Sequence, residues 1–311
     1  MLFTVLSYVV AAVHVLFPPY LLYQLWCTRF RTVGAWLIEA GFTAAVLAVL
    51  YLFGRWDVVG VPLRYGIGAT GFLGVLLSVV RVYDRPFATD EGIRWRWGAL
   101  IEGALFVGLL IWGGAGYWPG RSTVDLAAPL HGETYYVAHG GGTPPLNYHG
   151  AASTSQRYAL DVNQLNGWGL RADGLTPDSL SEYAVYGDTA YSPMSGRVVE
   201  AVDSLRDQRW PDEAQPAVGN HVWLRRGSLY VVLAHLKQGS VRVEAGERVE
   251  AGDPLAQVGH TGNTTEPHLH LHAVRGPAGA ASSPDSLADG SPVPVTIGGR
   301  FLTRNDMLPP R

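Results

Sequence analysis

The sequence predicts a chain of two parts: a region of four transmembrane helices and an all-β domain. Roughly the first 118 of its 311 residues form long apolar runs with few charges. Beyond them, short β-rich runs alternate with Gly, Pro, Asn and Asp, which favour turns. One such run carries a histidine at every second position: His268, His270 and His272. We therefore expect a transmembrane region over residues 1–118 and a β domain over residues 119–311, with its core at about 130–274.

Four segments are long and apolar enough to cross a bilayer, whose core takes about 20 residues of helix. They are residues 2–26, 33–53, 61–80 and 97–118. The first has no basic residue ahead of it and no small-residue cleavage site behind it, which favours a membrane helix over a cleavable signal. Tryptophans lie near the segment ends, as in interfacial belts: Trp26, Trp56, Trp95, Trp97 and Trp118.

The placement of arginines predicts how the helices are oriented in the membrane. The second connection carries Arg55 and Arg64. The first and third connections carry more: Arg29, Arg31, Arg81, Arg85, Arg94 and Arg96. Because basic connections tend to stay in the cytoplasm, we expect both termini, and everything after Trp118, on the outer side.

Three ionisable residues lie inside the predicted spans: His14, Glu39 and Glu102. Such residues are functional candidates by default, because a charge in the hydrocarbon core is costly. The alternative, which we favour, is that they pair with one another or with the backbone inside the bundle.

Several strands are expected in the second part, at residues 133–138, 158–162, 196–202, 220–224, 230–235 and 268–274. Residues 163–184 are polar and contain glycine, which predicts a surface insertion. The stretch 276–290 is rich in Ala, Ser, Gly and Pro, which predicts a mobile loop before a short strand at 293–297. This pattern is typical of a β-sandwich or a barrel.

Charge and composition argue against nucleic acid as a partner. After residue 118 the chain holds 15 Lys and Arg against 20 Asp and Glu, with no basic aromatic patch and no glycine-rich phosphate loop. Cys27 is the single cysteine, so a disulfide within the chain is excluded.

The H-x-H-x-H run predicts a metal site or proton chemistry. In a strand, successive side chains alternate faces, so the three histidines share one face and Leu269 and Leu271 point into the core. Imidazoles on one face of an otherwise apolar strand cost free energy unless they bind metal or transfer protons. Zinc suits neutral imidazole, and a hydrolytic site needs three protein ligands and an open position. The alternative is a histidine-rich surface strand without metal.

Four motifs in order resemble the LytM/lysostaphin-type zinc metallopeptidases, which cut peptide cross-links or stems of bacterial peptidoglycan. They are Q-R-Y-A-L-D-V at 156–162, A-Y-S-P-M-S-G-R-V-V at 190–199, G-N-H-V-W-L at 219–224 together with Y-V-V-L-A-H-L at 230–236, and V-G-H-T-G-N-T-T-E-P-H-L-H at 258–270. The resemblance covers about residues 130–274. It implies a LytM-like β-sandwich or barrel with a groove, one zinc ion, and a domain held on the extracellular or periplasmic side of a bacterial cytoplasmic membrane.

The resemblance also implies a role for individual residues. Asp161 and His270, the second histidine of the H-x-H pair, match zinc ligands of the family. His235 and His268 match the two histidines that do not bind zinc and are thought to handle protons or polarise the scissile carbonyl. We therefore expect His235 and His268 to be catalytic.

One ligand of the family is missing from its usual place. The family supplies a histidine four residues before the aspartate, but here that residue is Arg157, which stays protonated and cannot bind zinc. An N-Y-H sequence at 147–149 lies shortly upstream. Our hypothesis is that His149 reaches back and replaces the missing ligand. The alternative is an ordinary loop histidine and a lost metal site.

The remaining histidines carry weaker expectations. His272 continues the H-x-H face and is either hydrogen-bonded to a ligand or solvated. His221 lies in a strand and is expected to pack or to line the groove. We expect His260, His131 and His139 to be structural or exposed.

The function predicted from these motifs is that of a membrane-anchored zinc metalloendopeptidase acting on peptidoglycan. The chain has no H-E-x-x-H helix motif of other zinc proteases and no G-x-S-x-G elbow of serine hydrolases. Two alternatives remain. One is a catalytically degenerate domain that binds cell wall or regulates a partner hydrolase. The other makes the helices a transporter or signalling module. The bond cut, a protein partner and the oligomeric state stay open.

Overall fold

The computed structural model describes residues 2–89, 97–209, 215–276 and 290–309. The chain forms two compact units, Met1–Gly114 and Ala115–Arg311. The boundary lies close to the one expected at residue 118. Trp95, Arg94, Arg96 and most of the loop expected at 276–290 fall outside the described residues.

Long apolar helices make up the first unit. They are α1 (Leu2–Cys27), α2 (Val33–Phe53), the short α3 (Trp56–Val59), α4 (Val61–Leu77), which continues as the 3-10 turn η1 (Ser78–Arg81), and α6 (Trp97–Gly114), which leads into η2 (Ala115–Tyr117). Among the described residues, four helical spans are long and apolar enough to cross a membrane: Thr4–Cys27, Val33–Phe53, Val61–Arg81 and Trp97–Tyr117. These are the four predicted segments, and α1 runs on through Pro18 and Pro19.

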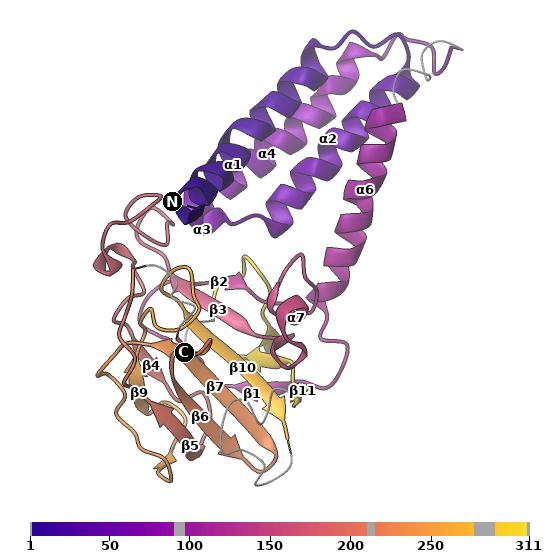
Figure 1. Cartoon of the computed structure of the whole chain (residues 1–311). Helices are drawn as coiled ribbons and strands as arrows, with labels where there is room; N and C mark the ends of the chain where they lie inside the picture. Colours follow the sequence, from indigo (N-terminus) through magenta and orange to yellow (C-terminus); the bar gives the residue numbers. More distant parts are fainter. Residues whose placement is uncertain (1, 90–96, 210–214, 277–289, 310–311) are drawn as a thin grey trace. The chain divides into compact units, whose positions relative to one another are not determined.

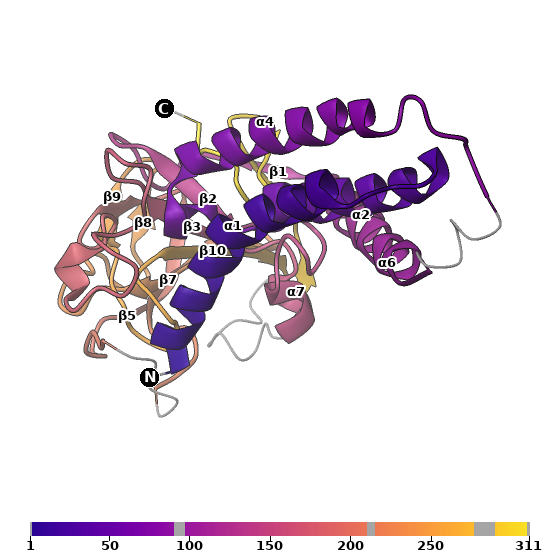
Figure 2. The ribbon, with the colours of Figure 1, turned by 90° about the horizontal axis from the view of Figure 1, so that it is seen from above.

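Figures 1 and 2 show the helices of this unit as ribbons. Local signals and polar side chains hold these helices in place. Thr32 caps α2, because its hydroxyl accepts the backbone N–H of Ala35. The indole of Trp36, on α2, donates to the hydroxyl of Ser78 at 2.9 Å. Of the ionisable residues in the spans, His14 is buried and its Nδ1 donates to the carbonyl of Val10 at 2.7 Å, whereas Glu102 is exposed on α6. His14 thus pairs with the backbone, as favoured above.

The second unit is β-rich. Its strands are β1 (Val124–Leu126), β2 (Tyr135–His139), β3 (Leu160–Gln164), β4 (Thr189–Tyr191), β5 (Gly196–Val202), β6 (Asn220–Arg226), β7 (Leu229–Leu236), β8 (Arg248–Val249), β9 (Pro254–Gln257), β10 (Leu269–Arg275), β11 (Ser291–Pro292), β12 (Val295–Ile297) and β13 (Arg300–Phe301). Its short helices are α7 (His149–Ala152), η3 (Thr154–Gln156) and η4 (Leu180–Glu182). Four apolar helices followed by a β-rich unit confirm the predicted fold class.

One large open sheet carries the site. Its described strands follow the order β2-β3-β10-β7-β6-β5-β8, with β11 paired to β10. Two smaller sheets, β1-β12-β13 and β4-β9, accompany it. In the described part of the chain no sheet closes into a barrel, so of the two predicted architectures the barrel is not the one formed.

The two faces of the large sheet differ in character. Leu269 and Leu271 of β10 point into the main core, together with Leu160 and Leu233 of the neighbouring strands. The opposite face carries the histidines, because side chains alternate along a strand. Pairing across this sheet sets one row of residues side by side on five strands: His221, Ala234, His270, Asp161 and His139. This row positions the candidate site.

Candidate metal and catalytic site

Two predicted metal ligands, His149 and His270, contact the carboxylate of the third, Asp161 on β3. The Nε2 atom of His149 lies 2.8 Å from Oδ2 of Asp161, and Nδ1 of His270 lies 2.9 Å from Oδ1. All three side chains are buried, and one ligand atom from each lies within 4.8 Å of the others. The structure therefore brings together the three residues that the sequence put forward as a ligand set.

His149 reaches Asp161 because Asn147 folds the intervening loop back. The Asn147 side-chain amide donates to the carbonyls of Gly141 at 3.1 Å, Arg157 at 3.2 Å and Ala159 at 2.8 Å. Its Oδ1 accepts the backbone N–H of His149 at 3.2 Å. Asn147 thus joins the start of α7 to the residues that enter β3.

Arg157, which occupies the family's usual ligand position, is engaged outside the cluster. Its Nε donates to the carbonyl of Gly142 at 3.2 Å, and its guanidinium lies 5.4 Å from the ring centroid of Tyr158. A Cβ on Gly150 would lie 3.2 to 3.5 Å from Arg157, so the glycine after His149 lets the loop pack tightly against it.

The donor set fits a zinc ion. Ligand atoms placed tetrahedrally at about 2.0–2.2 Å from zinc lie about 3.3 Å from one another. In the structure, one donor atom from each of the three residues lies within 4.8 Å of the other two, so the three can reach a common ion. Two imidazoles and one carboxylate also leave a fourth position open, as in catalytic zinc sites.

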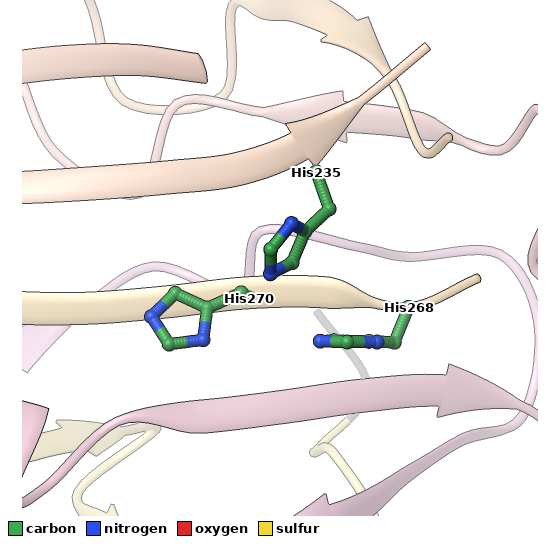
Figure 3. A group of neighbouring side chains, drawn as sticks. All are labelled: His235, His268 and His270. Atoms are coloured by element: carbon green, nitrogen blue, oxygen red, sulfur yellow. The ribbon is translucent and has the colours of Figure 1, made fainter. Parts of the chain in front are cut away.

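The two predicted catalytic histidines, His235 and His268, lie beside His270 of this cluster (Figure 3). His235 donates from Nδ1 to the carbonyl of Thr261 at 2.8 Å, and His268 donates from Nδ1 to the carbonyl of Glu266 at 2.8 Å. A carbonyl can only accept, so when either imidazole is neutral its Nε2 is left as an acceptor. The two ring centroids lie 4.9 Å apart, and Nε2 of His268 lies 3.3 Å from Oδ1 of Asp161.

The orientation of His235 depends on a tight contact between two loops. His235 has a φ of 63°, in the left-handed region that few side chains adopt. Thr261, whose carbonyl accepts from His235, is itself held by its hydroxyl, which accepts the N–H of Asn220 and donates to the carbonyl of Leu236. Gly219 has a φ of 62°, and a Cβ there would lie 2.3 Å from the Thr261 carbonyl oxygen. Only glycine fits this position.

Burial and mutual charge set the protonation states. Burial alone would raise the pKa of Asp161, but His149 and His268 outweigh it and hold that pKa well below its usual range. Burial opposes charge on His268 too, yet Asp161 raises its pKa above the ordinary value. Burial lowers the pKa of His270 to about 4 and that of His235 well below its usual range. At neutral pH, Asp161 is therefore ionised and His270 neutral, as metal binding requires.

The other histidines have defined partners. His272 is 5% exposed, and its Nδ1 lies 2.9 Å from Nε2 of His270, so it is hydrogen-bonded rather than solvated. His221 and His260 are buried and hydrogen-bond to backbone carbonyls. His139 accepts at Nδ1 from Arg304 at 2.7 Å, and the ring of His131 lies 3.8 Å from that of Tyr191.

One contact near the site was not foreseen from the sequence. Arg171, in the segment expected to be a surface insertion, is 4% exposed, and its Nε donates to Oε2 of Glu266 at 2.5 Å. Glu266 also supplies the carbonyl that accepts from His268. No local pattern signals an ion pair between residues 95 positions apart. The exposed Tyr148, whose ring centroid lies 4.3 Å from that of His149, was missed as well.

Comparison with known proteins shows that part of the second unit is similar to a peptidase family. The model of Peptidase family M23 matches residues 181–283. Similar solved structures include a zinc-containing peptidase from Vibrio cholerae, with 27% identity over 30% of this chain and 24% of that chain, at a TM-score of 0.23. The catalytic domain of the antimicrobial peptidase lysostaphin from Staphylococcus simulans has 23% identity over 33% of this chain and 72% of that chain, at a TM-score of 0.24.

A putative peptidase M23 from Pseudomonas aeruginosa has 21% identity over 54% of each chain, at a TM-score of 0.28. The chain thus spans about a quarter of the Vibrio cholerae peptidase and about half of the Pseudomonas aeruginosa protein. The family match lies within the second unit, and it confirms the predicted resemblance to LytM/lysostaphin-type metallopeptidases over residues 181–283.

Proposed function

We propose that the protein is a membrane-anchored zinc metalloendopeptidase that hydrolyses peptide bonds of peptidoglycan outside the cytoplasmic membrane. The observation that supports this most strongly is the convergence of His149 Nε2 and His270 Nδ1 on the two oxygens of the Asp161 carboxylate. These three residues would hold one zinc ion. The match to Peptidase family M23 supports the same reaction class and the same substrate.

The proposed mechanism divides the work between the metal ligands and the two other histidines. His149, Asp161 and His270 would hold the zinc ion, which would supply Lewis-acid polarisation of the scissile carbonyl and an acidified water. His235 is neutral at pH 7 and offers Nε2 as a proton acceptor. His268 has the higher pKa, which suits it to donate a proton to the leaving amine. Two neighbouring histidines with pKa values pushed apart are a common acid–base arrangement.

The membrane location rests on the first unit. Four apolar spans support a multi-pass protein with a lipid bilayer as its first partner. Arg29 and Arg31 follow the first span, and Arg81 and Arg85 follow the third. By the positive-inside rule these connections face the cytoplasm. The second unit would then lie on the extracellular or periplasmic side, where peptidoglycan is found.

A second candidate function is favoured by one observation, the arginine at position 157. A domain that has lost the usual ligand, and in which His149 fails to replace it, would bind cell wall or regulate a partner hydrolase without cutting. Such a domain would keep its fold and hold no zinc.

Metal analysis and hydrolysis by the full-length protein in lipid nanodiscs separate the two functions. We expect about one zinc per chain and release of new amino groups from peptidoglycan fragments. His270→Ala should abolish both. His221→Ala is the matched control, because His221 is buried in the same row of the sheet and hydrogen-bonds to the carbonyl of Gly219. A folded wild-type protein without zinc or hydrolysis would support the binding domain instead.

A further inference from the structure

His272 contacts the far nitrogen of His270, a proposed zinc ligand. His270 points Nδ1 at Asp161, and its Nε2 lies 2.9 Å from Nδ1 of His272. The histidines lie on β10 one pleat apart, with ring centroids 5.1 Å apart and ring planes at 69°. Both are buried, at 3% and 5% exposure. The two nitrogens therefore have each other, rather than bulk water, as partners.

The protonation of His270 must change when its Nδ1 binds a metal. Without metal, the Asp161 carboxylate can only accept, so Nδ1 of His270 carries the proton and Nε2 is an acceptor. A metal needs the lone pair on Nδ1, and the proton of a neutral imidazole must then sit on Nε2. The partner of Nε2 has to donate in the first state and accept in the second.

We infer that His272 is a positioning residue that supports both tautomers of His270 by reversing the direction of their shared hydrogen bond. In the metal-free state, Nδ1 of His272 donates to Nε2 of His270. In the metal-bound state, Nε2 of His270 donates to Nδ1 of His272. On metal binding, His270 Nδ1 loses its proton to water. His270 Nε2 then takes the proton of His272 Nδ1, and His272 Nε2 gains a proton from water. Both rings stay neutral and no net proton is exchanged.

The surroundings of His272 favour this role over a purely packing one. Its register partner on β7 is Val232, and the ring of Trp223 stands edge-on at 6.5 Å between centroids. Trp223 and Val232 belong to an apolar cluster on the site face of the sheet. Against this apolar cluster, the hydrogen bond to His270 is the polar contact that the described residues give the His272 ring, and it fixes the orientation of the ring. This is how residues behind a metal ligand commonly raise the affinity of a site.

The inference rests on the proposed zinc site, and zinc affinity measured by chelator competition tests it without reference to activity. The full-length protein in nanodiscs serves for all variants. His272→Leu removes the hydrogen-bonding partner, and we expect zinc binding about 10- to 100-fold weaker. His272→Gln keeps a group that donates and accepts, and it should recover most of the affinity. His221→Leu, which alters a buried histidine that hydrogen-bonds elsewhere, should bind zinc like the wild type.

A spectroscopic measurement on the wild-type protein tests the inference without depending on the folding of any variant. In wild-type protein, ¹H–¹⁵N spectra of the imidazoles should show the His270 proton moving from Nδ1 to Nε2 on addition of zinc. Equal affinity in His272→Leu and wild type would overturn the inference while leaving the zinc site intact, and so would a His272→Gln variant as weak as His272→Leu. A folded wild type that binds no zinc would contradict the proposed function and this inference together.

Discussion

The ion pair between Arg171 and Glu266 gives a prediction that can be worked out from the structure. The Arg171 side chain is 5% exposed and that of Glu266 is 13% exposed. Removing one partner of a buried ion pair lowers the free energy of unfolding by about 3–5 kcal/mol, because the remaining charge stays buried without a partner. Since Glu266 keeps some contact with water, we expect Arg171→Met to lower the unfolding free energy of the second unit by about 3 kcal/mol.

Loss of the ion pair between Arg171 and Glu266 should also lower the activity of the site. The Glu266 carbonyl accepts from His268 Nδ1 at 2.8 Å and from the hydroxyl of Thr264 at 2.9 Å. Loosening this segment should lower kcat more than it lowers zinc affinity, because Glu266 is not adjacent in sequence to any proposed ligand. Hydrolysis of peptidoglycan fragments and zinc titration measure the two effects separately.

The assay is urea unfolding of the full-length protein in detergent, arranged as a double-mutant cycle. The variant Arg171→Met with Glu266→Gln removes both charges and should be more stable than Arg171→Met alone. Arg209→Met is the matched control, because the ion pair of Arg209 with Asp178 is exposed, and such pairs contribute about 0–1 kcal/mol. If Arg171→Met and Arg209→Met cost the same, the reasoning from burial is refuted.

Two further predictions concern backbone fit and pH. In Gly219→Ala, the new Cβ would press on the Thr261 carbonyl that orients His235, so kcat should fall while zinc content stays unchanged; an unaltered kcat would contradict this. Burial raises the pKa of Asp188, although the Tyr135 hydroxyl opposes the shift by donating to its carboxylate. Between its unfolded pKa of about 3.9 and the raised value, the folded state holds a proton that the unfolded state has released. This group therefore makes the unfolding free energy fall as pH rises. Asp188→Asn should remove this pH-dependent part of the unfolding free energy. Identical pH profiles of urea unfolding for the variant and the wild type would contradict the prediction.

Local sequence patterns predicted most of the fold. Apolar length predicted α2 to its end residues, and alternation predicted that His268, His270 and His272 share a face, because both depend on neighbours in sequence. Whether the sheet closes depends on which edge strands meet, and no local pattern encodes that. The last predicted helix extended to residue 118, but α6 ends at Gly114 and continues as a 3-10 turn.

The site was open to prediction only in part. The resemblance supplied Asp161 and His270, and the N-x-H element suggested His149, whose role as a ligand stays a prediction. The three bonds of the Asn147 amide that fold the loop back could not be read from the sequence. Nor could the pairing of Arg171 with Glu266, because contacts between distant segments depend on the assembled tertiary structure.

The central claim is that His149 completes a zinc site with Asp161 and His270. The measurement that tests it most directly is the zinc content and zinc affinity of full-length His149→Ala beside wild type and His221→Ala. The account predicts about one tightly bound zinc in wild type and in His221→Ala. His149→Ala should lose tight zinc binding, because two protein ligands remain. A His149→Ala protein that holds zinc as tightly as wild type would contradict the claim.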